Sequence, residues 1–177
     1  MPALHSSAAY GHRGSPRTTG RPAQSGLPTL SVVIPALNEE ESIGTTVQRC
    51  LDAREHIRRA GRVRDIEITV VSDGSTDRTV EIAQGLAARE PAVSLIVFEK
   101  NRGYGAALKT GVLNTQAHAI LIMDADCSYP PDAIPRLIGR LEKADMVVGT
   151  RELGSEGVAG IRRPGKRVLN TFASDLV

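Results

Sequence analysis

The chain has 177 residues, which is enough for one compact domain and too few for two. Apolar residues make up 41% of it and the formal net charge is +2, so the composition favours an ordinary globular protein and gives no electrostatic footprint for nucleic acid. The two cysteines, Cys50 and Cys127, lack the spacing of a zinc site or a disulfide framework. No apolar run is long enough to cross a bilayer or to form a secretory signal, so we expect a cytoplasmic protein.

Composition divides the chain into two parts. Residues 1–28 are rich in Gly, Pro, Ser and Arg and contain no acidic residue. Such a segment cannot bury enough apolar surface to offset the entropy lost on ordering. The sequence therefore predicts a disordered N-terminal tail over residues 1–28 and a folded domain over residues 29–177.

From residue 30 onward, short apolar runs alternate with helical periods. Strands are expected over 30–34, 66–71, 93–98, 119–123 and 146–148. Helices are expected after Asn38 as the N-cap, with Ile43, Val47, Cys50 and Leu51 on the apolar face, then from about 77 to 90, over 106–113 and around 134–141. Strands that alternate with helices in this way are typical of βαβ units. We predict an α/β fold with a Rossmann-like, mostly parallel sheet and helices on both faces.

The ends of the predicted strands carry the most unusual polar segments. In open parallel sheets, ligands bind beyond the carboxyl ends of the strands, which share one edge. The segments at these ends are residues 35–39 (PALNE), 72–77 (SDGSTD), 100–105 (KNRGYG), 124–126 (DAD) and 149–151 (GTR). We therefore expect the chemistry of the protein to lie at this edge.

Asp124 and Asp126 follow a buried strand directly, and both carboxylates can turn toward one point once the strand has ended. Hard divalent cations take oxygen ligands and complete their shell with water and phosphate oxygens. A calcium loop has the same spacing at Asp124, Asp126 and Ser128, but its sixth and twelfth positions are Tyr129 and Pro135 instead of Gly and Glu. The pair is either two solvated turn acids or, as the buried strand before it and the Pro-Pro after it favour, a site for a divalent cation, Mg²⁺ or Mn²⁺.

Other segments have more than one interpretation. Asp73 is either only a turn and helix cap or also an acceptor for a ribose or base, and Arg151 is either a surface charge or a phosphate ligand. Gly103 and Gly105 allow close approach of the backbone to a phosphate, but Leu108 replaces the third glycine of the dinucleotide fingerprint. The segment 160–166 imitates a P-loop without the Ser or Thr that must follow it.

These motifs, taken in order, resemble the family 2 glycosyltransferases of the GT-A fold. The resemblance rests on residues 31–35 (SVVIP), 38–39 (NE), 71–77 (VSDGSTD) and 124–126 (DAD). Residues 101–105, 124–131 and 149–151, with Arg162 and residues 169–170, are similar to the polyprenyl-phosphate sugar transferases, such as dolichol-phosphate mannosyltransferase. Residues 72 and 127–129 depart from the usual pattern, with Ser for Asp and Cys-Ser-Tyr for Leu-Gln-His.

The resemblance implies a role for each matching residue. The nucleotide pocket would be lined by Pro35, Ala36, Glu39, Val71 and Asp73. Asp124 would hold both nucleotide and metal, Ala125 would contribute backbone, and Asp126 would be the main metal ligand, with Ser128 near the metal. Arg151 and Arg162 would contact the donor diphosphate or the acceptor phosphate, and Asp126 and Arg151 would act in catalysis.

The reaction that the resemblance implies is inverting transfer of a sugar from a nucleoside diphosphate to a lipid phosphate or a glycan. No residue is evident as a general base, and this favours an acceptor that is already an anion, such as a polyprenyl phosphate. One alternative is a truncated, non-catalytic module that binds nucleotide with the same fold. A sugar-nucleotide pyrophosphorylase is a second, but it would require a glycine-rich basic loop after the first strand, where this chain has Pro35 to Glu39.

Members of this family continue beyond the point that corresponds to Val177, so we expect a domain that is incomplete at its C-terminus. The last residues, from Arg162 to Leu176, have the pattern of a basic amphipathic helix. That helix would either bind an anionic membrane surface peripherally or pack on the domain's own core. We expect the chain to bind nucleotide and metal but to transfer sugar to a lipid phosphate poorly.

Overall fold

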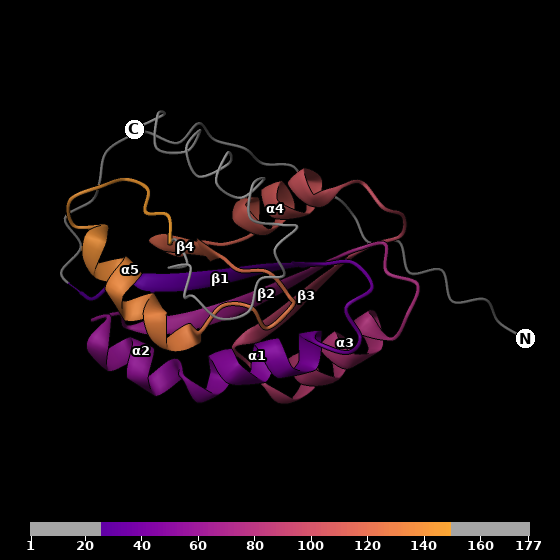
Figure 1. Cartoon of the computed structure of the whole chain (residues 1–177), viewed down its shortest axis with the longest axis horizontal. Helices are drawn as coiled ribbons and strands as arrows, with labels where there is room; N and C mark the ends of the chain where they lie inside the picture. The colour runs from indigo at the N-terminus through magenta and orange to yellow at the C-terminus, as the bar shows by residue number, and fades with distance from the viewer. Residues whose placement is uncertain (1–25, 150–177) are drawn as a thin grey trace, which may run out of the picture.

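The computed structural model describes residues 26–149, which form a parallel four-stranded sheet covered by helices on both faces (Figure 1). The strands are β1 (Thr29–Ala36), β2 (Asp65–Asp73), β3 (Val93–Phe98) and β4 (Ala119–Ile122). Their order across the sheet is β3-β2-β1-β4. The chain therefore builds outward from β1 to β3 and then crosses back to place β4 on the other side of β1.

The helices are divided unequally between the two faces. They are α1 (Ile43–Asp52), α2 (Arg54–Ala60), α3 (Thr79–Arg89), α4 (Tyr104–Leu113) and α5 (Ile134–Arg140), the last preceded by a 3₁₀ turn over Pro131–Ala133. Helices α1, α2 and α3 cover one face, and α4 crosses the other (Figure 1). This arrangement confirms the predicted α/β fold with a parallel sheet between two helical layers.

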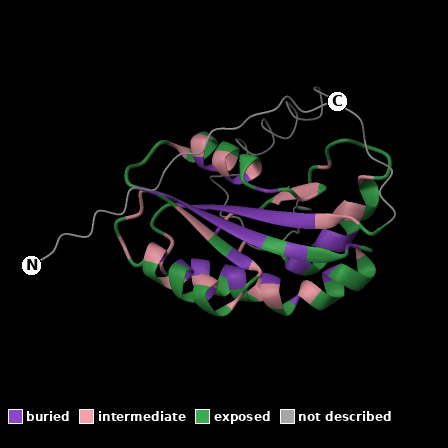
Figure 2. Ribbon diagram, turned by 180° about the vertical axis from the view of Figure 1, so that it is seen from behind, coloured by how far each residue is buried: buried purple, intermediate pink, exposed green. Residues whose placement is uncertain are grey.

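Alternation along the strands divides the core between the two faces. Val32 and Ile34 pack toward α1 and α3, whereas Val33 packs toward α4 together with Val71 and Phe98. Both central strands, β1 and β2, are buried along almost their whole length (Figure 2). Strands buried on both faces read as continuous apolar runs, and this explains why the strands were visible in the sequence.

The first strand continues past Pro35, where the sequence predicted its end. Val33 is the last residue of β1 that pairs with β4, opposite Ile122, and its carbonyl accepts a hydrogen bond from the Met123 amide. The missing N–H of Pro35 faces this same side, where β4 has already ended. Proline is tolerated in a strand where no ladder hydrogen bond is needed. β1 therefore extends to Ala36, which pairs only with β2.

Two further expectations about secondary structure are wrong. Asn38 does not cap α1: the helix begins at Ile43, five residues later, with Ser42 at the N-cap position, and Asn38 has a positive φ of 54°. The expected strand 146–148 is irregular in the structure, with Met146 78% and Val148 73% exposed. An apolar run of three residues is too weak a signal to define a strand without a partner edge.

Helix α4 lies against the sheet through Gly111. A Cβ atom at this position would lie 2.4 Å from Cγ1 of Val33 and 3.2 Å from Cγ2 of Val71. We expect Gly111→Ala to reduce the free energy of unfolding by about 1–3 kcal/mol, because the added methyl group overpacks a rigid interface. Chemical denaturation measures the change.

The matched control is Gly85→Ala in α3, where a Cβ atom would meet nothing within 4 Å. Alanine is favoured over glycine inside a helix, so this variant should gain about 0.5–1 kcal/mol. Equal effects of the two substitutions would show that the contact between α4 and Val33 is not close.

None of the helices between residues 26 and 149 combines the length and the apolar composition that a membrane span requires.

Candidate active site

The loops that follow the four strands meet at the carboxyl edge of the sheet, at the right-hand end of the molecule in Figure 1. The chain adds β2 and β3 on one side of β1 and β4 on the other side. The ladder between β1 and β4 stops at Val33 and Ile122. The last residues of β1 therefore have no strand beside them on the β4 side in the described part of the chain. Ligands of open α/β sheets bind at such a point.

Hydrogen bonds join the loop after β1 to the loop after β2. The Asn38 amide donates to Oγ of Ser75 (3.1 Å), and the Asn38 side-chain oxygen accepts from the Thr76 amide (2.9 Å). The Glu39 amide donates to Oγ1 of Thr79 (2.7 Å). Asn38 therefore connects two loops instead of capping a helix, and its left-handed backbone conformation, which asparagine tolerates, serves that contact.

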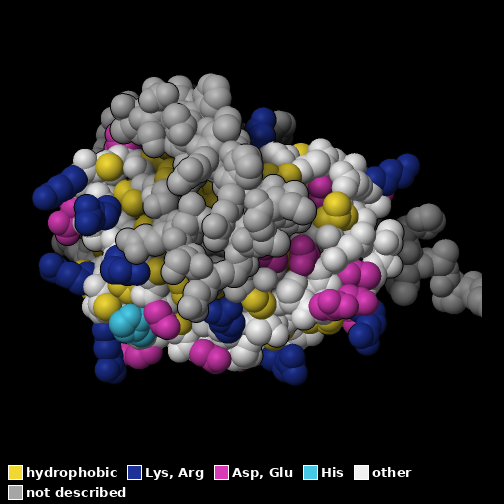
Figure 3. Space-filling model, viewed as in Figure 1, with side chains coloured by type: hydrophobic (Ala, Val, Ile, Leu, Met, Phe, Trp, Pro, Cys, Tyr) yellow, Lys and Arg dark blue, Asp and Glu magenta, His cyan; other side chains and the backbone are white. Residues whose placement is uncertain are grey.

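Acidic residues reinforce the same junction. The carboxylate of Asp77 accepts hydrogen bonds from the Glu40 amide (3.0 Å) and from the amide of Thr79 (2.9 Å), and Glu40 accepts from the Arg78 amide (3.0 Å). Although partial desolvation opposes ionisation, these hydrogen bonds lower the pKa of Asp77. Acidic side chains gather beside Lys and Arg side chains at this end of the molecule (Figure 3).

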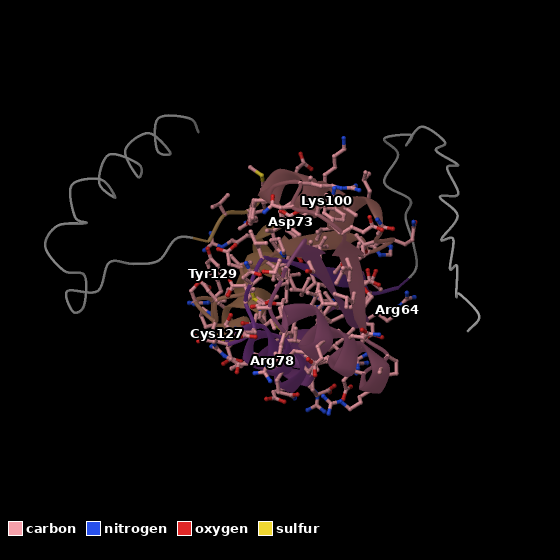
Figure 4. All side chains as sticks on the ribbon, turned by 90° about the vertical axis from the view of Figure 1, so that its right-hand side faces the viewer. Arg64, Asp73, Arg78, Lys100, Cys127 and Tyr129 are labelled. Carbon is pink, nitrogen blue, oxygen red and sulfur yellow. The ribbon has the colours of Figure 1, made fainter. Side chains whose placement is uncertain are left out.

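Asp73 ends β2 and holds the loop that follows β3. Its side chain is only 3% exposed, and Oδ1 accepts a hydrogen bond from the Arg102 amide (2.7 Å). The two loops approach closely, since a Cβ atom on the adjacent Gly74 (φ 76°) would lie 2.4 Å from the Asn101 nitrogen. Figure 4 looks onto this edge and shows Asp73 beside Lys100. The carboxylate of Asp73, the first aspartate of the SDGSTD segment, therefore lies buried at the sheet edge and accepts a backbone hydrogen bond.

The first residue of α4 reaches across to the loop after β4. The hydroxyl of Tyr104 donates to Oδ1 of Asp124 (3.1 Å). Partial burial and the negative charge of Asp124 raise the pKa of Tyr104, so the phenol keeps its proton and remains the donor. The loop between β3 and α4 thus contacts Asp73 at its start and Asp124 at its end.

The segment from Asp124 to Ser128 forms a tight turn. Ala125 is buried and Asp126 is exposed, and Oδ1 of Asp126 accepts from the Ser128 amide (2.9 Å). Cys127 has a positive φ of 60°, which costs a non-glycine residue about 1–2 kcal/mol. Helix α1 holds this turn: Thr46 Oγ1 donates to the Ala125 carbonyl (2.7 Å), and Arg49 donates to the Cys127 carbonyl (2.8 Å).

The oxygen atoms here fit a hard divalent cation that keeps part of its water shell. In the described residues there is no group of three or more His, Cys, Asp or Glu side chains that could enclose a metal. The segment after β4 instead carries two carboxylates, Asp124 and Asp126, and the Ser128 hydroxyl, a buried oxygen without a hydrogen-bond partner. Two or three hard ligands suit Mg²⁺ or Mn²⁺, which take further oxygens from water and phosphate. Cys50 lies in the apolar core, and its burial raises the pKa of the thiol to about 11.

The structure places most of the predicted site residues at one edge of the sheet. Pro35 and Ala36 lie at the buried end of β1, Asp73 ends β2, and Asp124 and Asp126 lie in the loop after β4. The Glu39 carboxylate accepts from the Ser42 hydroxyl (2.6 Å) at the start of α1.

Three predicted positions do not contribute a described side chain at the surface of this edge. Val71 is fully buried in the core beneath α4. Arg151 and Arg162 lie outside the described residues, as do the tail up to residue 25 and the expected C-terminal helix.

At the other end of the domain, Pro28, which the sequence placed in the tail, accepts a hydrogen bond from the Arg64 amide (2.7 Å).

Sequence reasoning missed Thr46, Arg49 and Tyr104. Thr46 is 3% exposed and lies among the apolar positions of α1, so a polar residue within an apolar helical face was the available signal. Tyr104 lies within the strand-end segment 100–105, in which only the glycines were given a structural role.

The fold and this edge define an open α/β class of protein, and comparison with known sequences gives the family. The profile of Glycosyl transferase family 2 matches residues 31–175, so the chain belongs to that family. It is 34% identical over 145 residues to an undecaprenyl-phosphate 4-deoxy-4-formamido-L-arabinose transferase of Photorhabdus laumondii, covering 81% of this chain and 42% of the relative. A transferase of the same name from Pseudomonas aeruginosa strain LESB58 is 35% identical over 140 residues, or 78% of this chain and 40% of the relative. The chain thus spans about two-fifths of the length of these relatives.

Solved structures agree on the GT-A fold. The mannosyltransferase PcManGT from Pyrobaculum calidifontis, in complex with GDP-Man and Mn²⁺, has a TM-score of 0.56 and 24% identity, over 66% of this chain and 33% of that one. Glucosyl-3-phosphoglycerate synthase from Mycobacterium tuberculosis, in complex with Mn²⁺, UDP and glucosyl-3-phosphoglycerate, has a TM-score of 0.52 and 26% identity, over 72% of this chain and 47% of that one. The predicted family resemblance is confirmed.

Proposed function

We propose that this chain forms the donor site of a metal-dependent, inverting glycosyltransferase that uses a nucleoside-diphosphate sugar and acts on a polyprenyl phosphate or another membrane-associated acceptor. The observation that carries the proposal is the pair Asp124 and Asp126 in the loop after β4, the strand that the chain adds on the opposite side of β1 from β2. Family membership supports the reaction class, and the names of the relatives support an undecaprenyl-phosphate acceptor.

The roles follow the geometry of the edge. The nucleoside would lie over the ends of β1 and β2, near Pro35, Ala36 and the buried carboxylate of Asp73. The diphosphate would lie toward the turn after β4, where Asp124, Asp126 and Ser128 supply oxygen ligands for a divalent cation. Glu39 and Val71 would support this pocket from the loop and the core, and Ala125 would do so through its backbone. Arg151 and Arg162 remain candidates for phosphate contacts. The domain that carries these groups would span residues 29–177.

The chain's own groups would then assist the departure of the nucleoside diphosphate. A divalent cation supplies electrostatic stabilisation of the negative charge that grows on the leaving diphosphate. Asp124 and Asp126 would fix the position of the cation relative to the sugar, and Tyr104 would orient Asp124 through its hydrogen bond. A phosphate acceptor is already anionic and attacks without a general base. Attack on the face opposite the leaving group inverts the anomeric carbon.

The nature of the acceptor bears on where the protein works. A polyprenyl phosphate would bring the chain to the cytoplasmic face of a membrane as a peripheral protein. Mg²⁺ and Mn²⁺ both fit the oxygen ligands, and the Mn²⁺ of the two similar structures favours testing manganese first.

Calorimetric titration of the full chain with UDP and GDP, with and without manganese, tests the proposal. We expect one of the two nucleotides to bind and its affinity to rise when manganese is present, because the cation links the diphosphate to Asp124 and Asp126. Absence of binding by either nucleotide, in either condition, would overturn the proposed function. A catalytically inactive nucleotide-binding module would bind in the same way but would release no nucleoside diphosphate when given a nucleotide sugar and a polyprenyl phosphate.

A further inference from the structure

The turn that carries the two candidate metal ligands is held against the first helix by several hydrogen bonds. Thr46 and Arg49 lie one turn apart on α1, almost eighty residues before the segment that they touch. The hydroxyl of Thr46 donates its proton to the Ala125 carbonyl (2.7 Å) and accepts from the Cys127 amide (3.1 Å). One hydroxyl has one proton and two lone pairs, so both bonds form at once.

Cys127 is held by α1 through each of its polar groups. Its amide bonds to Thr46, its carbonyl accepts from Nη1 of Arg49 (2.8 Å), and its thiol lies 3.0 Å from Oγ1 of Thr46 and 3.6 Å from the Ser42 carbonyl. Toward the Ser42 carbonyl the thiol is the donor. A left-handed conformation at a non-glycine residue persists only where the surroundings enforce it. Helix α1 supplies that enforcement here.

Asp126 lies between the two groups that Thr46 binds. The carbonyl before it and the amide after it are both fixed to the same hydroxyl, so the direction of the Asp126 side chain is set by α1 and not by the turn alone. The side chain of Asp126 is exposed, while that of Ala125 is 3% exposed. If the two bonds to Thr46 are lost, the strained turn can relax and the carboxylate changes direction.

We propose that Thr46 and Arg49 are positioning residues, which hold residues 124–128 in the shape that lets Asp124 and Asp126 bind one divalent cation. This inference rests on the proposed function for the identity of the ligand. It assigns to α1 a role in metal affinity although neither side chain is itself a metal ligand. Groups that orient metal ligands in this way affect metal affinity by about 10- to 100-fold.

The decisive variant is Thr46→Val, which keeps the branched shape and removes the hydroxyl. We expect the manganese-dependent part of nucleotide affinity to fall by about 10- to 100-fold, and nucleotide binding without metal to stay unchanged. Thr46→Ser keeps the hydroxyl and should bind like the wild type. Thr45→Val, at the exposed neighbouring threonine of α1, is the matched control and should have no effect. Arg49→Met removes the second contact with less risk to folding and should act in the same direction.

Amide hydrogen exchange, followed by NMR without metal or nucleotide, gives a readout that is independent of binding. The Cys127 amide should exchange faster in Thr46→Val than in the wild type, while the amides of β1 and β2 stay protected. Unchanged exchange at Cys127, or wild-type manganese dependence in both Thr46→Val and Arg49→Met, would overturn the positioning role. A wild-type protein that binds no nucleotide with manganese, but whose Cys127 amide responds as expected, would instead overturn the proposed function.

Discussion

Asp126→Ala is expected to abolish the manganese dependence of nucleotide binding while the domain remains folded. Asp126 is exposed and is one of the two carboxylates proposed as ligands in the loop after β4, so the cation would lose one of them. Substitution of a residue that only orients a metal ligand already lowers metal affinity by about 10- to 100-fold, so loss of a ligand itself should lower it by at least as much. Stability should fall by only about 1 kcal/mol, from the lost hydrogen bond to the Ser128 amide.

Calorimetry with UDP or GDP and manganese measures the first effect, and thermal unfolding measures the second. Asp132→Ala is a suitable control, because Asp132 is an exposed aspartate in the 3₁₀ turn that follows the same loop. Equal nucleotide affinity in Asp126→Ala and the wild type, with manganese present in both, would remove Asp126 from the metal site. A large fall in melting temperature would mean that the carboxylate is needed for folding.

The sheet could be predicted from the sequence because its strands are short, mainly apolar runs, and the two central strands, β1 and β2, are buried along almost their whole length. Such runs gave β3 its observed bounds, Val93–Phe98, and located β1, β2 and β4 to within a few residues. The ends were less predictable because they depend on neighbours. Whether Pro35 ends β1 is decided by where β4 stops, and the role of Asn38 is decided by the loop after β2. Neither partner is visible in the local sequence.

The acidic residues of the candidate site could also be predicted, because strand ends of a parallel sheet share one edge. The residues that hold them could not. Thr46 reads as an ordinary member of a helix, and only the fold shows that its hydroxyl meets Ala125 and Cys127. Val71 was assigned to the pocket by its motif, whereas its side chain is fully buried against α4. A motif identifies an edge of the sheet, and the register decides which face each side chain occupies.

Asp73→Ala is expected to weaken nucleotide binding by about 1–3 kcal/mol, both with and without manganese, because a charge-assisted hydrogen bond to ribose or base is lost. The structure shows a second use of the same carboxylate, which accepts the Arg102 amide at 2.7 Å. Loss of that bond would loosen the loop that leads to Tyr104, whose hydroxyl reaches Asp124. Asp73 can therefore influence the nucleotide directly or influence the metal site through this loop.

Two further variants separate these routes when all are titrated with UDP or GDP, with and without manganese. Asp73→Asn keeps an oxygen that can accept the Arg102 amide but removes the charge, so a direct contact with the nucleotide predicts weaker binding in both conditions. Tyr104→Phe breaks only the link to Asp124 and should affect binding only with manganese. If Asp73→Ala behaves like Tyr104→Phe, and Asp73→Asn binds like the wild type, Asp73 acts by holding the loop, and its assignment to the nucleotide is wrong.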